Sequence, residues 1–466
     1  MESGNVATTE CEQDLEILYH TLAREVLRVL ELAQRTEPLD RVVRVELAVD
    51  VAEPYAWLSA QPFEQKILWS DRTRCWTSAG AGVADLVEPG YGNDLDEMIR
   101  RVQALRGTSA RYFGGVRFDT RRETAPEWEP FGTFRFVLPR FEFVERDGLA
   151  VLACNLVFPR DLNRRPQLLQ EIQRLQLPAG GRRDDLSLPE YRRDVPDREG
   201  WIRNVEWGLD AFVAGTLGKV VFARKVDFGF SDDVDPVRLL EKLHTATPDC
   251  FHFCFQVDSN TAFLGASPER LFLREGREVL SEAVAGTRPR GDSAEDDERL
   301  CDELFHSQKD RLEHAYVQRS VTTMLTRLCT DVTADTDPVE MRLARGRHLL
   351  SRIRGVLREG TNDVEIIRAL HPTPAVGGHP TGAALEAIRE REAFDRGWYA
   401  GPIGWIGTDS AEFAVGIRSG LVRGDTLSLY SGAGIVPGSK PEAEHEEIEQ
   451  KISDFIRILG LDNRRS

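Results

Sequence analysis

The segment YAGPIGWIGTDSAEFAVGIRSGLVRGDTLSLYSG, residues 399–432, carries the pattern that decides the fold. It contains three apolar runs, at 399–407, 412–420 and 426–432, which glycine and charged residues separate. Runs of this length bounded by turn residues predict strands.

Working outward from this segment, strand patterns and helix patterns occur in separate blocks. Further strands are expected at 42–50, 111–118, 219–228, 251–257, 262–267 and 270–281, and in a hairpin over 134–158 whose turn carries Asp147 and Gly148. Helices are expected at 14–35, 166–176, 201–214, 235–246, 296–330, 338–358, 363–370 and 440–459. Blocks of this kind predict an α+β fold with large, mainly antiparallel sheets flanked by helices, not a doubly wound α/β fold.

The segment 177–197 is rich in proline, glycine and charge, and we interpret it as the boundary between two lobes. Residues 1–197 would then form an N-terminal lobe, and residues 198–466 would form a second, catalytic region.

The composition excludes several classes of protein. The 466 residues are 41% hydrophobic and 29% charged, as in a globular protein with a large core. The net charge of −17 argues against a nucleic acid or an anionic membrane surface as partner. Scattered cysteines and the lack of a signal sequence or an apolar span of about 20 residues predict a cytoplasmic protein.

Two charged residues stand at the ends of apolar runs. Lys219, one of only seven lysines, begins the strand pattern KVVFAR, and Glu269 follows FLGASP in a turn. A partly desolvated lysine has a lowered pKa and can serve as a base, while a buried carboxyl can serve as an acid. The alternatives are a lysine that extends its charge into solvent and a glutamate that forms an ion pair.

The glycine-rich segment SGAGIVPG, residues 431–438, joins a strand to an acidic helix. Its backbone N–H groups can approach an anion such as a carboxylate. On the helix, Glu444, Glu447 and Lys451 share one face, and Glu313 lies on another predicted helix. Two glutamates from separate helices, with waters and a substrate carboxylate, would suit Mg²⁺, and a solvated helix with local ion pairs is the alternative.

Together, nine segments from Trp201 to the C-terminus resemble the chorismate-utilising enzymes, a family that includes isochorismate, salicylate, anthranilate and aminodeoxychorismate synthases. They are GKVVFARK, FLGASPERLF, SEAVAGTRPRG, KDRLEH, LHPTPAVGGHP, RGWYAGPIGW, VGIRSG, YSGAGIVPGSKPEAE and EIEQKI. The resemblance implies the chorismate-binding fold, similar to that of anthranilate synthase component I, with chorismate as the substrate and Mg²⁺ as the cofactor.

The resemblance also implies a role for each matching residue. Lys219 matches the general base that activates water, and Glu269 matches the general acid. Glu313 and Glu447 match the magnesium ligands, and Glu444 resembles an acidic neighbour of the metal. The residues that resemble substrate-binding positions are Thr287, Tyr399, Arg418, Gly432, Ala433, Gly434 and Lys451.

Within the family, HPTPAVGG at 371–378 resembles the isochorismate synthase form, and the lysine at 219 agrees because anthranilate synthases resemble one another in lacking it. The implied reaction is an isomerisation in which water adds at C2 of chorismate and the C4 hydroxyl leaves, with no obligatory glutaminase partner. The segments RGWYAGPIGW and PAVGG look closest to the menaquinone-pathway form. The alternatives are a salicylate synthase, an ammonia-using anthranilate or aminodeoxychorismate synthase component, and a non-catalytic ligand-binding homologue.

Overall fold

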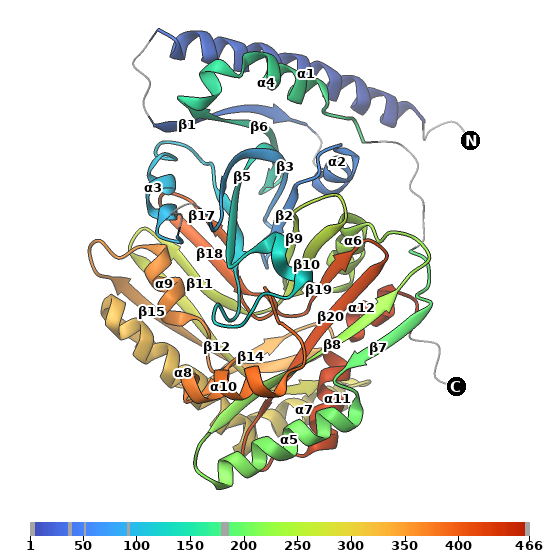
Figure 1. Cartoon of the computed structure of the whole chain (residues 1–466), viewed down its shortest axis with the longest axis vertical. Helices are drawn as coiled ribbons and strands as arrows, with labels where there is room; N and C mark the ends of the chain where they lie inside the picture. Colours follow the sequence, from blue (N-terminus) through green and yellow to red (C-terminus); the bar gives the residue numbers. More distant parts are fainter. Residues whose placement is uncertain (1–4, 36–39, 51–52, 91–93, 179–185, 462–466) are drawn as a thin grey trace.

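The computed structural model describes residues 5–35, 40–50, 53–90, 94–178 and 186–461. In this part of the chain, twenty strands join into one hydrogen-bonded network, and all of their pairings are antiparallel. Helices flank this network (Figure 1). The prediction of an α+β fold with large, mainly antiparallel sheets is therefore confirmed.

The network has two arms that both start at one long strand, β5 (Phe134–Arg146). On one side of β5, the first arm consists of β6 (Leu149–Phe158) and then β1 (Arg41–Val49). On the other side it continues, in order of pairing, through β3 (Trp76–Val87), β2 (Lys66–Ser70), β9 (Phe251–Gln256), β10 (Thr261–Ser267), β19 (Ser419–Arg423), β20 (Thr426–Ile435) and β8 (Lys219–Gly229). Two short strands, β7 (Tyr191–Val195) and β16 (Gly378–His379), also pair with β8. The second arm runs through β4 (Tyr112–Val116), β17 (Pro402–Ile406), β18 (Ser410–Val415), β11 (Arg270–Glu275), β12 (Glu278–Pro289) and β15 (Gly346–Leu357), with β13 (Cys329–Ala334) and β14 (Val339–Arg342) paired to β15.

Twelve α-helices flank the strands in the described part of the chain. They are α1 (Asn5–Ala33), α2 (Pro54–Ala60), α3 (Glu97–Gln103), α4 (Arg165–Gln173), α5 (Arg198–Val213), α6 (Pro236–Ala246), α7 (Ala294–His306), α8 (Gln308–Leu328), α9 (Asp363–Leu370), α10 (Thr381–Arg391), α11 (Pro441–Lys451) and α12 (Ser453–Ile458). Helices α1 and α4 lie beside β1 and β6 at one end, while α5, α7 and α11 lie at the other (Figure 1). None of the helices in the described residues is both long enough and apolar enough to cross a bilayer.

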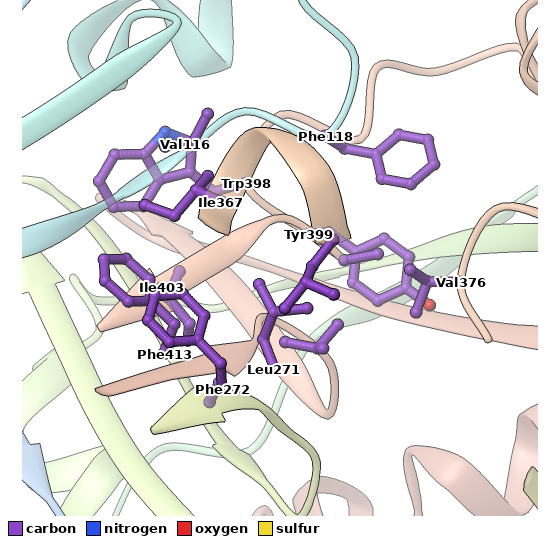
Figure 2. Packing of buried hydrophobic residues seen from close by; sticks show 14 of the residues in the cluster. Val116, Phe118, Leu271, Phe272, Ile367, Val376, Trp398, Tyr399, Ile403 and Phe413 are labelled. Atoms are coloured by element: carbon purple, nitrogen blue, oxygen red, sulfur yellow. The ribbon is translucent and has the colours of Figure 1, made fainter. Parts of the chain in front are cut away.

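A large aromatic core joins the two arms. Phe255 of the first arm packs against Trp398, with ring centroids 5.6 Å apart, and Trp76 packs edge-on against Trp405 of the second arm at 5.3 Å. Within the second arm, the rings of Phe272 and Phe413 stack at 5.2 Å (Figure 2). Because large aromatic side chains bury more apolar surface than any others, this core fixes how the arms sit against each other.

Most of the predicted elements are confirmed, including the hairpin β5–β6, whose turn residues Asp147 and Gly148 have φ of 51° and 78°. Left-handed backbone at both positions suits a tight hairpin turn. Two helix predictions are wrong, one in part and one entirely. The helix predicted at 296–330 is two helices, because Ser307 ends α7 and caps α8 by accepting a hydrogen bond from the Asp310 N–H.

The helix predicted at 338–358 does not exist, since β14 and β15 occupy that segment. At the end of β15 buried residues alternate with exposed ones, as for Ile353 and Arg354, which is the period of a strand. Gly346 closes the tight turn that precedes this strand, where its carbonyl accepts from the Leu343 N–H at 2.8 Å. Pairing with β12 on one edge and β13 on the other outweighs the helical propensity of this arginine-rich segment.

Three strand pairings cross the predicted lobe boundary at residue 197. Strand β2 pairs with β9, β4 pairs with β17, and β7 pairs with β8, so strands before the boundary complete sheets made by strands after it. The division into a lobe of residues 1–197 and a catalytic region of residues 198–466 stays a prediction.

Candidate active site

A cavity of about 740 Å³ lies where β8 and β20 meet the corner between β10 and β11 and the helices α8 and α11. Its described lining residues are Val221, Pro268, Glu269, Val284, Ala285, Gly286, Thr287, Glu313, His348, Ala375, Val376, Tyr399, Ile417, Arg418, Tyr430, Ser431, Gly432, Gly434, Glu447 and Lys451. Figure 2 shows two of them, Val376 and Tyr399, at the edge of the aromatic core. The cavity combines apolar side chains with a few charged and polar ones, which is the usual lining of a small-molecule site.

Lys219, the first residue of β8, has no exposed side-chain surface. Its Nζ lies 2.9 Å from Oε1 of Glu313, on α8, and has no hydrogen bond with good angles to any described residue. Glu313 lines the cavity, so Lys219 lies immediately beside the cavity, with the Glu313 carboxylate between them. If the carboxylate of Glu313 bound another cation instead, the buried ammonium of Lys219 would lose this ion pair.

Glu269 lies in the corner between β10 and β11, and only 6% of its surface is exposed. Its pKa is raised from 4.5 to about 7. Burial is the main cause, the ammonium groups of Lys219 and Lys451 oppose the rise, and the nearby charge of Glu282 adds to it. The carboxyl group therefore holds its proton to near neutral pH, which is what a general acid needs.

Three glutamates of α8 and α11 lie near the cavity, each with a lysine partner. Besides the Lys219–Glu313 pair, Glu447 binds Lys451 at 2.7 Å, and Glu444 binds Lys309 at 2.6 Å. Burial disfavours the charge on Glu447, but Lys451 outweighs it and holds the pKa of Glu447 below the usual range. Burial and the neighbouring charge of Glu447 raise the pKa of Glu444.

The donor set fits Mg²⁺. Glu313 and Glu447 come from different helices and both line the cavity, so their oxygens could share one ion with substrate and water. Among the described residues, no three acidic, histidine or cysteine side chains are grouped as a complete metal cage. Mg²⁺ usually binds proteins through one or two carboxylates, with the remaining positions left to substrate oxygens and water.

Two cations face the same cavity. Lys451 donates to the carbonyl of Gly432 at 2.8 Å, and Arg418 donates to the carbonyl of Lys451 at 3.4 Å. Arg418 has a φ of 50°, a left-handed backbone that is rare for arginine. Strained residues of this kind concentrate at binding sites. The two side chains give the cavity a positively charged wall that suits a carboxylate ligand.

Glycines keep the cavity open beside the reactive groups. A Cβ atom on Gly434 would collide with Oε1 of Glu313 and lie 3.0 Å from Cε of Lys219. A Cβ on Gly432 would lie 3.0 Å from the hydroxyl of Tyr399. Glycine is therefore needed at both positions because of close approach rather than backbone conformation.

The structure brings together all but one of the predicted site residues. Glu269, Thr287, Glu313, Tyr399, Arg418, Gly432, Gly434, Glu447 and Lys451 line the cavity, and Lys219 adjoins it through Glu313. Ala433 is fully buried in the core between the two glycines and does not belong to the described lining. The individual roles of these residues stay predictions.

Several lining residues had no predicted role, among them His348, Ser431 and Val376. Burial lowers the pKa of His348 to about 4, and its Nδ1 bonds to the carbonyl of Gly286 at 2.9 Å, so the ring is neutral. It escaped notice because its segment was predicted as a helix. The buried hydroxyl of Ser431 has no hydrogen-bond partner among the described residues, which leaves it available to a ligand or water.

The chain resembles known proteins in sequence and in fold. A family model described as chorismate binding enzyme matches residues 28–460. The chloroplastic isochorismate synthase of Catharanthus roseus is 35% identical over 407 residues, which are 84% of this chain and 70% of that protein. Isochorismate synthase MenF of Haemophilus influenzae is 31% identical over 422 residues, 90% and 92% of the two chains. The structure of MenF, the menaquinone-specific isochorismate synthase from Escherichia coli, matches with a TM-score of 0.82 at 27% identity, covering 95% of this chain and 99% of that one.

Proposed function

The chain belongs to the chorismate binding enzymes, and from this premise we propose that it is an isochorismate synthase, an isomerase that converts chorismate to isochorismate. One observation carries the proposal: the buried carboxyl of Glu269, with a pKa of about 7, shares a cavity wall with a sealed lysine and two cationic side chains. A protonated carboxyl can donate a proton to a hydroxyl leaving group, and the cationic side chains can bind the carboxylates of a dicarboxylate substrate.

Substrate binding comes first. Chorismate carries two carboxylates, and Arg418 and Lys451 offer the charges that bind them in the cavity. Contacts at a few ångströms in a partly dry site outweigh the repulsion of the net charge of −17, which salt screens over about 8 Å. The ring of Tyr399, stacked on Tyr430 at 5.2 Å, supports one wall of this site.

The chemical step moves two protons. Glu269 gives its proton to the C4 hydroxyl, which leaves as water, and Lys219 takes a proton from the water that attacks C2. Both double bonds of the ring shift. One water enters and one leaves, so the product is an isomer of the substrate. Lys219 can accept a proton only as the free amine, so it must leave its ion pair with Glu313 and release its ammonium proton to solvent before the water attacks C2.

We assign Glu313 and Glu447 to hold Mg²⁺, supported by their oxygen donors at the cavity wall. When bound, the ion would neutralise negative charge on the ring carboxylate. Lys451 pairs with Glu447 at 2.7 Å and so keeps this carboxylate charged and in place beside the cavity.

The menaquinone pathway and a cytoplasmic location also belong to this proposal. The first is supported by the likeness to the menaquinone-specific enzyme of Escherichia coli. The second is supported by the scattered cysteines, of which the described six are all free.

The direct test is to incubate the pure protein with chorismate and Mg²⁺ and to identify the product by mass spectrometry and NMR. Isochorismate is the expected product. Salicylate with pyruvate would indicate a salicylate synthase, and a product that forms only with ammonia would indicate an anthranilate or aminodeoxychorismate synthase component. Binding of chorismate without turnover would indicate a non-catalytic homologue.

A further inference from the structure

The backbone around Glu269 is held from three directions. Its carbonyl accepts from the Val415 N–H at 3.0 Å, and its N–H donates to Oγ of Ser267 at 3.3 Å. The carbonyl of Pro268, the preceding residue, accepts from Nη1 of Arg72 at 2.9 Å. Val415 and Ser267 belong to β18 and β10, which flank the corner, whereas Arg72 lies 196 residues earlier in the chain than Pro268.

The strand register explains how this distant arginine reaches the corner. Ser70 of β2 pairs with His252 of β9, and His252 pairs with Ala266 of β10. Two residues beyond these pairs, Arg72 and Pro268 come to the same level on the same edge of the sheet. The register of three antiparallel strands therefore dictates the contact.

Arg72 also binds Glu282, a residue of β12 whose side chain has no exposed surface. The two groups form a bidentate pair with distances of 2.8 and 2.7 Å. Glu282 accepts a further bond from Nη1 of Arg270 at 3.1 Å, and Arg270 binds Glu412 at 2.8 Å. Two arginines and two glutamates thus form a chain of ion pairs behind the corner, with two positive and two negative charges.

We propose that Arg72 is a positioning residue for Glu269, which it holds through the Pro268 carbonyl and influences through the charge of Glu282. The inference rests on the proposed function, because it concerns the group that protonates the leaving hydroxyl. The charge of Glu282 raises the pKa of Glu269. Arg72 neutralises part of that charge, so it sets both the place of the acid and the pH range over which it keeps its proton.

The charges around Glu269 define the expected directions. Lys219 of β8, Lys451 of α11 and Glu282 of β12 act on it directly, Tyr399 faces it, and the other titratable or charged groups of the cavity are Glu313, His348, Arg418, Tyr430 and Glu447. Removing the charge of Glu282 lowers the pKa of Glu269. Removing Arg72 leaves Glu282 less neutralised, so the pKa of Glu269 rises.

The experiment measures kcat and kcat/KM against pH for the full chain and its variants, after the wild-type chain has been shown to form isochorismate. Glu269 must be protonated, so kcat/KM falls on the alkaline side as pH rises through its pKa. We expect R72M to lower kcat by about 10- to 100-fold with KM little changed, because the hydrogen bond from Arg72 to the Pro268 carbonyl no longer positions Glu269. We also expect its alkaline limb to move to higher pH, whereas E282Q moves that limb to lower pH.

Two further variants complete the design. R72K keeps the charge beside Glu282, so it should restore the wild-type limb and part of kcat. R274M is the matched control: Arg274 forms a bidentate pair with Asp363, at 2.5 and 2.9 Å, on the neighbouring strand β11, away from Glu269. R274M should lower thermal stability without moving the alkaline limb.

The proposal is overturned if R72M and E282Q leave the limb in place, if both move it in the same direction, or if R72M behaves as R274M does. Should R72M fail to fold, R72K and E282Q still decide between these outcomes. Carboxyl NMR of Glu269 in the free proteins gives the same pKa shifts without turnover. A wild-type chain that forms no isochorismate would therefore refute the proposed function separately from this inference.

Discussion

Replacing Glu269 by glutamine should stabilise the free protein at alkaline pH while abolishing its activity. Glutamine keeps the shape of the side chain but cannot ionise. In the wild-type protein the buried carboxyl holds its proton up to a pKa of about 7, whereas in the unfolded chain it releases the proton near 4.5. Between these values the folded state binds more protons than the unfolded state, so raising the pH favours unfolding.

The size of the effect follows from the two pKa values. Each pH unit between 4.5 and about 7 is worth about 1.4 kcal/mol, so the wild-type protein loses about 3 kcal/mol that E269Q does not lose. The loss is complete above pH 7 and absent below 4.5. With 6% of its surface exposed, Glu269 has little solvent to screen this cost.

The assay is urea unfolding of wild type and E269Q at a series of pH values, without substrate or metal, followed by tryptophan fluorescence. All other titrating groups are common to both proteins, so the difference between the two unfolding free energies isolates Glu269. E446Q, at an exposed position of α11, is the control and should show no pH-dependent difference. If wild type and E269Q show the same dependence on pH, burial does not hold the proton on Glu269, and its role as general acid at neutral pH is refuted.

Three other changes probe the rest of the site. K219A should lower kcat at least about 100-fold, the usual scale for a general base, and near-normal turnover by the folded variant would remove Lys219 from that role. EDTA should abolish activity and Mg²⁺ should restore it, whereas full activity of the metal-free protein would remove Glu313 and Glu447 from metal binding. G434A should lower kcat by about 10-fold or more with little change in melting temperature, since its Cβ would displace Glu313 and crowd Lys219. Unchanged kinetics would show that turnover does not depend on the close approach of Glu313 and Lys219 to residue 434.

Sequence patterns predicted the antiparallel sheets because strand and turn signals are local. They failed at residues 338–358, where the strands β14 and β15 exist through pairing with β12 and β13 rather than through local preference. That failure also hid His348, because a residue on a supposed surface helix gives no reason to expect contact with a cavity. Tertiary pairing is thus the information that the local pattern lacked.

The candidate site was predictable to the extent that its residues lie in short, ordered motifs. Lys219, Glu269 and Arg418 could each be singled out from their neighbours in the chain. The Lys219–Glu313 ion pair could not, since it joins a strand to a helix that meet only in the folded protein. The same holds for Arg72, which reaches Pro268 through the register of three strands.

The most direct test of the central claim is to run the reaction in ¹⁸O-labelled water and to locate the label in the product. If Lys219 activates water for attack at C2 while Glu269 expels the C4 hydroxyl, the isochorismate formed must carry one ¹⁸O atom, in its C2 hydroxyl. Isochorismate without the label would mean that the hydroxyl group moves within the substrate, and that result would contradict the account.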